Sequence, residues 1–178
     1  MPVRLYVQDI RTPGNEACLR LEDVHSGGVH TVAWAPYDIH METSTGAPVD
    51  TSNPNLLMTA GSDPVIHLFD VRRAEAQTPL FSFRGHAHPS AKKWPTIHPP
   101  KFLNSDIIVA AGESSLALSL YCTKTGTTIS RGDMEDYPMA IACARRRQTT
   151  DTDADDIYDV AVSCKRGGLV YSLRPIIS

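Results

Sequence analysis

NLLMTAGSDPVIHLFD (residues 55–70) is the stretch that decides the fold of this chain. A short run of small apolar residues leads into a turn, and a second run, VIHLF, follows it. The second run has the period-two alternation that is typical of a half-buried strand. Gly61 stands where the first run meets the turn, and it permits the positive φ that hairpin turns need. We therefore predict a strand, a tight turn and a second strand.

The same pattern occurs twice more along the chain, as DIIVAAGESSLALSLY (residues 106–121) and IYDVAVSCKRGGLVYSL (residues 157–173). Each copy has glycine beside the turn, at Gly112 and at Gly167-Gly168. The matched positions Leu57, Ile108 and Val160 stand 51 and 52 residues apart. Two nearly equal spacings indicate an internal repeat, and a repeat determines the architecture.

Further predicted strands flank each hairpin. Upstream runs occupy residues 29–34, 93–97 and 139–143, and downstream runs occupy residues 80–83 and 127–130. Residues 3–11 and 17–22 supply two more strands ahead of the first hairpin. Four strands in a unit of about 40–50 residues is the period of a β-propeller blade. The predicted fold class is all-β.

The predicted domain organisation is a single propeller domain of about three blades' worth. It comprises strands of one blade in residues 3–23, a blade in 24–84, a blade in 85–132 and a partial blade in 133–178. A closed propeller needs at least about four blades. Open ends leave unpaired sheet edges and exposed apolar faces. We expect the chain to be the C-terminal part of a longer propeller, or to complete a ring with a second chain.

Composition narrows the classes of partner. The 178 residues are 42% hydrophobic and 21% charged, with a net charge of −3. Nucleic-acid binding over a broad surface needs a clear basic excess, so we expect no nucleic-acid partner. No stretch approaches the roughly 18 apolar residues of a membrane span, and the first residues lack an apolar signal segment. The four scattered cysteines suit an intracellular protein, so we expect a nuclear or cytoplasmic location.

No catalytic or metal-binding constellation stands out. His86, His88 and His98 are close in sequence, but no cysteine or carboxylate at ligand spacing completes a metal site. The chain has no G-x-S-x-G motif and no phosphate-binding glycine loop. We therefore expect no enzyme activity, no metal and no cofactor.

Two polar inserts interrupt the predicted blades between their first and second strands. Residues 37–55 are rich in Thr, Ser, Pro and Asp, and residues 145–156 read RRRQTTDTDADD. Because both fall at the same point of a blade, we expect them to project from one rim as mobile, solvated loops. For Arg145–Arg147 we expect a solvated surface, with a nuclear signal or a phosphate contact as the alternative.

The second unit resembles a WD40 repeat. VHS (24–26) stands where that family has Gly-His, TAGSD (59–63) resembles its Ser/Gly/Asp turn, and LFDVR (68–72) resembles its terminal Trp-Asp with a following Arg. The next unit opens with Gly85-His86. The chain is therefore similar to WD40-repeat β-propeller proteins. Later units match less closely, with Tyr121-Cys122 for Trp-Asp, Glu113 for the turn Asp, and only Asp133–Asp136 in place of the last Gly-His.

The resemblance implies a structural role for four residues. In the family a His, a strand Ser or Thr, the turn Asp and a strand Trp form a hydrogen-bonded tetrad that braces the blade. The resemblance carries this over to His25, Thr59 and Asp63, with Phe69 in the place of Trp. Phenylalanine has no N–H to donate, so we expect the last bond of the tetrad to be missing, a net loss of about 1 kcal/mol.

The resemblance also implies binding to other proteins through the rims of a rigid scaffold, although a fold alone does not give a function. Asp70-x-Arg72 is repeated one blade earlier as Asp9-x-Arg11. An exposed arginine at this point can pair with carboxylates or carbonyls of a partner. In substrate receptors of cullin-4 ubiquitin ligases, a Trp-Asp-x-Arg box marks blades that dock on the ligase's propeller adaptor. The layout is similar to the C-terminal WD domain of that class.

We therefore predict that Asp9, Arg11, Asp70 and Arg72 bind a partner protein, with the cullin-4 ligase adaptor as one hypothesis. The alternative is a WD40 scaffold subunit of a chromatin or RNA-processing assembly. Only the ligase hypothesis requires both Arg11 and Arg72 to be exposed and intact. No motif in the sequence identifies the client protein.

Overall fold

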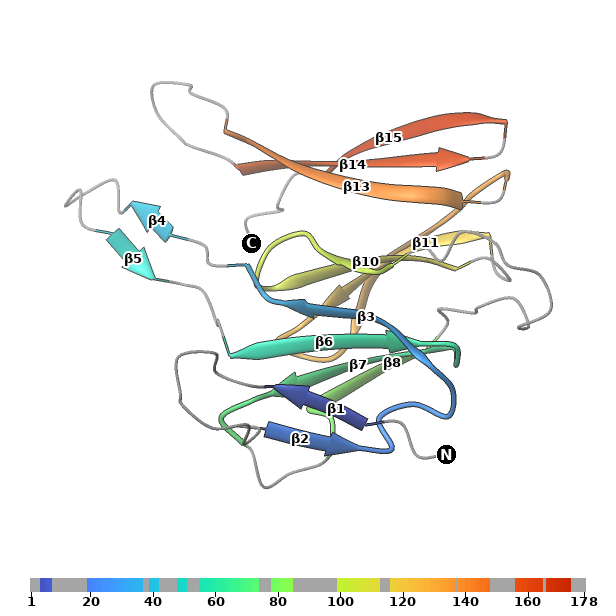
Figure 1. Ribbon diagram of the computed structural model, residues 1–178. Helices are drawn as coiled ribbons and strands as arrows, with labels where there is room; N and C mark the ends of the chain where they lie inside the picture. Colours follow the sequence, from blue (N-terminus) through green and yellow to red (C-terminus); the bar gives the residue numbers. More distant parts are fainter. Residues whose placement is uncertain are drawn as a thin grey trace.

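The computed structural model describes residues 4–7, 19–36, 39–41, 48–50, 55–73, 78–84, 99–112, 116–136, 138–147, 156–164 and 166–173. These residues form β-strands joined by turns and loops, which confirms the predicted all-β class (Figure 1). Within the described residues no helix is long and apolar enough to cross a membrane.

The hairpin of residues 55–70 forms the middle of a four-stranded antiparallel sheet with the order β3-β6-β7-β8. Its strands are β3 (Val29–Trp34), β6 (Leu56–Gly61), β7 (Val65–Asp70) and β8 (Phe81–Arg84). Every residue of β6 is buried, whereas in β7 buried and half-buried residues mix. The two strands therefore differ as their sequences do, with a run that is apolar except for Thr59 in the first and an alternating run in the second.

The second and third hairpins build two more antiparallel sheets, ordered β12-β11-β10-β9 and β13-β14-β15. Their strands are β9 (Lys101–Phe102), β10 (Ile107–Gly112), β11 (Ala117–Cys122), β12 (Thr128–Asp133), β13 (Pro138–Arg147), β14 (Asp156–Cys164) and β15 (Gly167–Leu173). Ahead of the first full sheet, β1 (Arg4–Val7) and β2 (Leu19–Glu22) pair as a two-stranded ribbon. The repeat in the sequence is therefore a repeat of sheets.

The sheets stack face on face in chain order, from the β1–β2 ribbon at the bottom of Figure 1 to β13–β15 at the top. An apolar cluster fills each of the three interfaces. The first joins the ribbon to β6 and β7, the second joins the sheet of β3–β8 to that of β9–β12, and the third joins β9–β12 to β13–β15. Burial of these clusters is the main force that holds the stack together.

Successive residues of the second strands point into different interfaces. Leu57 belongs to the first cluster and Met58 to the second, while Ile108 belongs to the second and Val109 to the third. Side chains alternate between the two faces of a strand, so a strand covered on both faces favours apolar residues at most positions. This explains the largely apolar runs from which the repeat was recognised.

The first strand of the second full sheet lies further along the chain than we expected. Residues 93–97, where we predicted it, fall outside the described residues. The strand that pairs with β10 is Lys101–Phe102, with Phe102 opposite Ile108 and Lys101 opposite Val109. Pro99 and Pro100 immediately precede it, and proline has no N–H for a strand ladder, so a two-residue strand is all that forms there.

The inserts are not simple loops where they are described. In the first, β4 (Ile39–Met41) pairs with β5 (Pro48–Asp50) as a small antiparallel ribbon. In the second, Arg147 still pairs with Asp156, so β13 continues three residues into the expected loop and β14 begins at its last residue. Our prediction of loops was wrong at these positions, because strand pairing satisfies backbone groups that a loop would leave to water. The β4–β5 ribbon, the end of β13 and the start of β14 all lie at the left in Figure 1.

The first strand of the first full sheet, β3, has one face exposed to solvent. The ribbon of β1 and β2 packs on Leu57 and Phe69 of β6 and β7, while Val32 and Trp34 of β3 remain exposed. The described sheets thus form an open stack. The described strands fall within the blade boundaries 3–23, 24–84, 85–132 and 133–178, and those boundaries stay a prediction.

Candidate functional site

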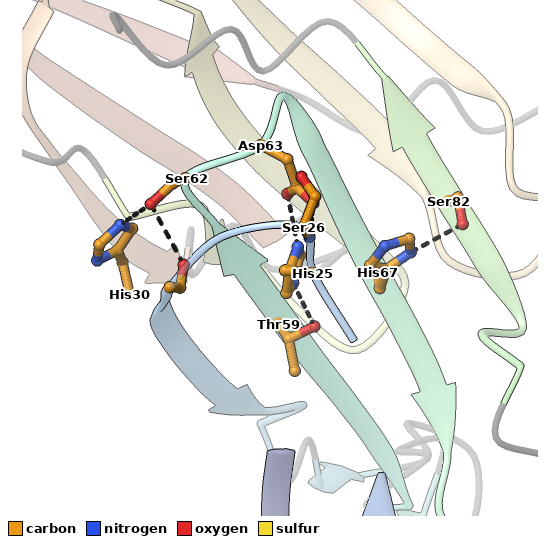
Figure 2. Close-up of polar contacts among 9 residues, drawn as sticks. His25, Ser26, His30, Thr59, Ser62, Asp63, His67 and Ser82 are labelled. Carbon is orange, nitrogen blue, oxygen red and sulfur yellow. Dashed lines mark hydrogen bonds and ion pairs between the residues drawn. The ribbon is translucent and has the colours of Figure 1, made fainter. Parts of the chain in front are cut away.

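A buried histidine links the loop before β3 to the turn between β6 and β7 (Figure 2). His25 Nδ1 lies 2.6 Å from Asp63 Oδ1, and His25 Nε2 lies 3.0 Å from Thr59 Oγ1. Since a carboxylate only accepts, Nδ1 donates to Asp63, and in the neutral imidazole Nε2 accepts from the Thr59 hydroxyl. Asp63 Oδ2 also accepts from the Ser26 amide at 2.9 Å. Three of the four residues of the implied tetrad are therefore linked through His25.

The Asp63 carboxylate keeps its charge at this partly buried position. Burial raises its pKa, but hydrogen bonds from the Ser26 amide and from His25 lower it by more, so the pKa falls below 3.8. Every donor that surrounds Asp63 favours the ionised form. The histidine side chain is wholly buried, and this arrangement holds the loop and the turn together.

Phe69, the fourth tetrad position, packs against apolar neighbours instead of the imidazole. It is buried with Leu21, Val24 and Leu57, and its ring has no N–H to contribute. The ring beside His25 is that of His67, at a centroid distance of 4.8 Å. His67 Nδ1 also lies within hydrogen-bond distance of Ser82 Oγ, at 2.9 Å. Sequence analysis did not identify His67. The pairing of β6 with β7 places it opposite Thr59, which is the partner of His25.

A second contact joins the same loop and turn at the surface. His30 Nε2 lies 2.6 Å from Ser62 Oγ, and the Ser62 hydroxyl reaches the Gly28 carbonyl at 3.5 Å (Figure 2). His30 was not among the predicted residues either. Together with the Asp63 contacts, it makes the loop of residues 25–30 part of one rigid corner.

The glycine at this corner serves close packing. Gly61 does not have a left-handed φ, and a Cβ there would lie 2.7 Å from His25 Cγ and 2.9 Å from the Gly28 carbonyl oxygen. Gly167 and Gly168 are likewise outside the left-handed region and lie within β15. Our prediction of positive φ at these glycines was wrong, because they belong to extended strands rather than to the turns themselves. Among the described residues, Asp23, Leu116 and Gly126 have φ values of 52°, 44° and 73°.

The predicted partner-binding pair lies where β7 ends. Asp70 accepts three hydrogen bonds from Arg72: from the backbone N at 3.1 Å, from Nε at 3.0 Å and from Nη2 at 2.7 Å. The Asp70 side chain is 7% exposed and that of Arg72 is 60% exposed. The bidentate contact of Arg72 lowers the pKa of Asp70, so the carboxylate stays charged. The remaining guanidinium N–H groups can bind a carboxylate or a backbone carbonyl.

Other predicted residues fall outside the described part of the chain. These are Asp9 and Arg11 of the earlier Asp-x-Arg pair, and His86, His88 and His98. Within the described ranges, no group of three or more His, Cys, Asp or Glu side chains is placed to hold a metal ion.

In the last sheet, the loop before β13 is also hydrogen-bonded to the turn between β14 and β15, but donor and acceptor are exchanged between loop and turn. Asp136, in the loop before β13, accepts a hydrogen bond from the backbone N of Arg166 at 2.8 Å. Arg166 lies in the turn between β14 and β15. In the first sheet the turn supplies the carboxylate and the loop supplies the amide, whereas here the loop supplies the carboxylate. The sequence had shown only that Gly-His is absent from residues 133–136.

Comparisons with known proteins give a fold and no family. No protein-family model matches the chain, and no curated protein matches it. One similar solved chain belongs to the crystal structure of the mitotic checkpoint complex, with 16% identity and a TM-score of 0.53 over 98% of this chain. Another is the WD40 β-propeller domain of Doa1, with 12% identity and a TM-score of 0.43 over 90% of this chain. The chain spans about half of each of these structures, 47% and 45% of their lengths.

The arrangement of the sheets agrees with the similarity to the chain in the mitotic checkpoint complex. Four-stranded antiparallel sheets stack face on face, and the likeness at a TM-score of 0.53 extends over nearly the whole chain. The fold is an all-β, WD40-type β-propeller that is partial and open, with about three blades' worth of strands.

Proposed function

We propose that this chain is a protein-interaction scaffold that serves as a substrate-receptor subunit of a cullin-4 ubiquitin ligase. In this proposal Asp70 and Arg72 dock on the propeller adaptor of the ligase, with Asp9 and Arg11 as the equivalent pair one blade earlier. The complex acts in the nucleus or the cytoplasm, and the chain itself performs no chemistry.

The observation that carries the proposal is that Asp70 holds the guanidinium of Arg72 in place at the end of β7. Asp70 is nearly buried and holds both Nε and Nη2 of Arg72, while the guanidinium remains largely exposed. A cation fixed in this way loses little side-chain entropy when a partner binds, which is the advantage of preorganisation. The resemblance of LFDVR to the Trp-Asp-x-Arg box adds the identity of the partner.

The proposal is tested by affinity capture from cells that express the tagged full-length protein. Wild-type protein should recover the cullin-4 adaptor, and an Arg11→Ala/Arg72→Ala double variant should lose it. Arg131→Ala serves as the matched control, because Arg131 is an exposed arginine on β12, away from the turn. Asp70→Asn should weaken capture less than Arg72→Ala, since it loosens the arginine without removing it.

Absence of the adaptor from the wild-type capture, or its undiminished recovery by the double variant, overturns this docking model. The alternative function, a scaffold subunit of a chromatin or RNA-processing assembly, predicts stable capture of such an assembly that neither arginine substitution affects.

A further inference from the structure

The turn after β11 is the structural equivalent of the turn after β7. In the first full sheet the hairpin ladder begins with Leu56 opposite Asp70, and in the second it begins with Ile107 opposite Cys122. The Val71 amide donates to the Asn55 carbonyl at 2.9 Å, and the Thr123 amide donates to the Asp106 carbonyl at 2.8 Å. These two matching contacts place Cys122 where the first sheet has Asp70, and Lys124 where it has Arg72.

A cation is therefore present at the same place in both sheets, but its carboxylate comes from a different residue. Cys122 has no carboxylate, so it cannot hold Lys124 as Asp70 holds Arg72. Instead, Lys124 Nζ lies 2.7 Å from Oδ2 of Asp106. Asp106 stands just before β10, in the position that Asn55 has before β6. In the second sheet the carboxylate of the ion pair therefore comes from the residue before β10, whereas in the first sheet it comes from the last residue of β7.

Hydrogen bonds keep this acidic residue in place. The Asp106 amide donates to Asn104 Oδ1 at 2.9 Å, and the Ser105 hydroxyl donates to Asp106 Oδ1 at 3.3 Å. The Thr123 hydroxyl, one residue before the lysine, donates to the Ser105 carbonyl at 2.8 Å. The loop before β10 and the turn after β11 are therefore tied together on both sides of the Asp106–Lys124 pair.

Both turns present an exposed cation whose carboxylate partner is less exposed. The side chains of Arg72 and Lys124 are 60% and 69% exposed, while those of Asp70 and Asp106 are 7% and 40% exposed. Arg73, next to Arg72, is also exposed. A protein surface that binds both turns must offer acceptors, and carboxylates suit it best because their charge complements the cations.

We propose that Lys124, held by Asp106, extends the docking surface of Arg72 onto the neighbouring sheet, and that the two cations bind one acidic surface of the partner protein. This inference rests on the proposed function for the identity of the partner. It adds a second contact point that the Asp-x-Arg pattern does not contain, since the corresponding residues read Cys-Thr-Lys.

The test is a binding titration of the purified full-length protein with the purified cullin-4 adaptor at two salt concentrations. Lys124→Ala should weaken binding about fivefold at low salt, and it should flatten the salt dependence because exposed ion pairs are screened. Lys124→Arg should restore most of the affinity. Asp106→Asn should weaken binding by a smaller factor, since the lysine remains but loses its anchor. Arg131→Ala should match wild type.

The outcomes separate the two proposals. If wild-type protein does not bind the adaptor, the proposed function fails, and the partner assigned to Lys124 fails with it. If Arg72→Ala weakens binding while Lys124→Ala does not, the proposed function stands and the extension to Lys124 is overturned. Thermal unfolding of each variant excludes misfolding as the cause: the variants of the exposed residues Arg72, Lys124 and Arg131 should match wild type, and Asp106→Asn, at a half-buried residue, is compared at a temperature well below its own transition.

Discussion

The first full sheet and the last sheet are joined at the same place by different polar groups. In each, the loop before the first strand must be tied to the turn between the second and third strands. In the sheet of β3–β8 a buried imidazole, a carboxylate and a hydroxyl do this together. In the sheet of β13–β15, the carboxylate of Asp136 accepts a hydrogen bond from the Arg166 amide across the same two segments.

The difference teaches that the position of the link is set by the fold, and its strength by burial and by the number of bonds. The His25 side chain is fully buried, so water cannot take the place of either of its hydrogen bonds when that bond is broken. The bond from Asp136 to the Arg166 amide is exposed, and water competes for both groups.

The largest effect should come from removing the imidazole. His25→Ala leaves the buried Thr59 hydroxyl without a partner, removes a donor to Asp63 and creates a cavity. We expect a loss of about 3 kcal/mol in the free energy of unfolding, measured by urea denaturation. Hydrogen exchange should locate the loss, with the β6 amides exchanging faster and the β14 amides unchanged. An effect no larger than that of Asp136→Ala would show that burial does not separate the two links.

The next effect concerns the glycines beside the two turns. Gly61→Ala places a methyl group within 2.7 Å of the His25 ring and 2.9 Å of a backbone carbonyl, neither of which can move away without breaking the corner. We expect a loss of about 2 kcal/mol, in the range for overpacked positions. Gly167→Ala is the matched control, because a Cβ there meets nothing within 4 Å. Equal melting temperatures for the two variants would contradict this account of the corner.

A smaller effect should follow from cutting the link of the last sheet. Asp136→Ala removes the acceptor of the Arg166 amide, and the loss should be about 0.5–1 kcal/mol because water replaces the bond. Asp136→Asn keeps an acceptor oxygen and should recover most of this stability. If Asn is as destabilising as Ala, charge rather than the hydrogen bond holds this loop.

The smallest effect is a pH dependence that only the first sheet should have. Burial, followed by the nearby His25, lowers the pKa of His67 below 6.5; Asp63 opposes this and Arg84 adds to it. The unfolded chain therefore takes up this proton more readily than the folded chain does, and stability decreases as the pH falls through 6.5. His67→Asn should remove this part of the pH dependence between pH 7.5 and 5.5 in thermal unfolding. An unchanged profile would assign the dependence to other groups.

Local patterns in the sequence were sufficient for the hairpins. The apolar runs of residues 55–70, 106–121 and 157–173 became β6–β7, β10–β11 and β14–β15 because local alternation and turn residues specify a hairpin without distant contacts. The outer strands were found where their side chains are β-branched or aromatic, as at Val29–Trp34 and Phe81–Arg84. The sequence analysis did not indicate the short strand Lys101–Phe102, which follows two prolines, or the pairing of β4 with β5 inside an insert that was predicted to be a loop.

The candidate site divides in the same way. The sequence named His25, Thr59 and Asp63 through a family resemblance, and it named Asp70-x-Arg72 because the two residues are neighbours in the chain. It did not reveal His67 beside His25, Asp106 beside Lys124, or Asp136 at the Arg166 amide. None of these three contacts belongs to a contiguous motif.

The sequence by itself determined the all-β class and the residues of each hairpin, because these depend on local side-chain periodicity. It also determined the repeat, because the same pattern recurs at spacings of 51 and 52 residues. Tertiary structure alone decided which further polar groups meet across loops and turns. Arg166 lies 30 positions from Asp136, and Lys124 lies 18 from Asp106. Such pairs form only after strand register and loop closure bring distant segments together, and side chains from two elements then share one charge or one hydrogen bond.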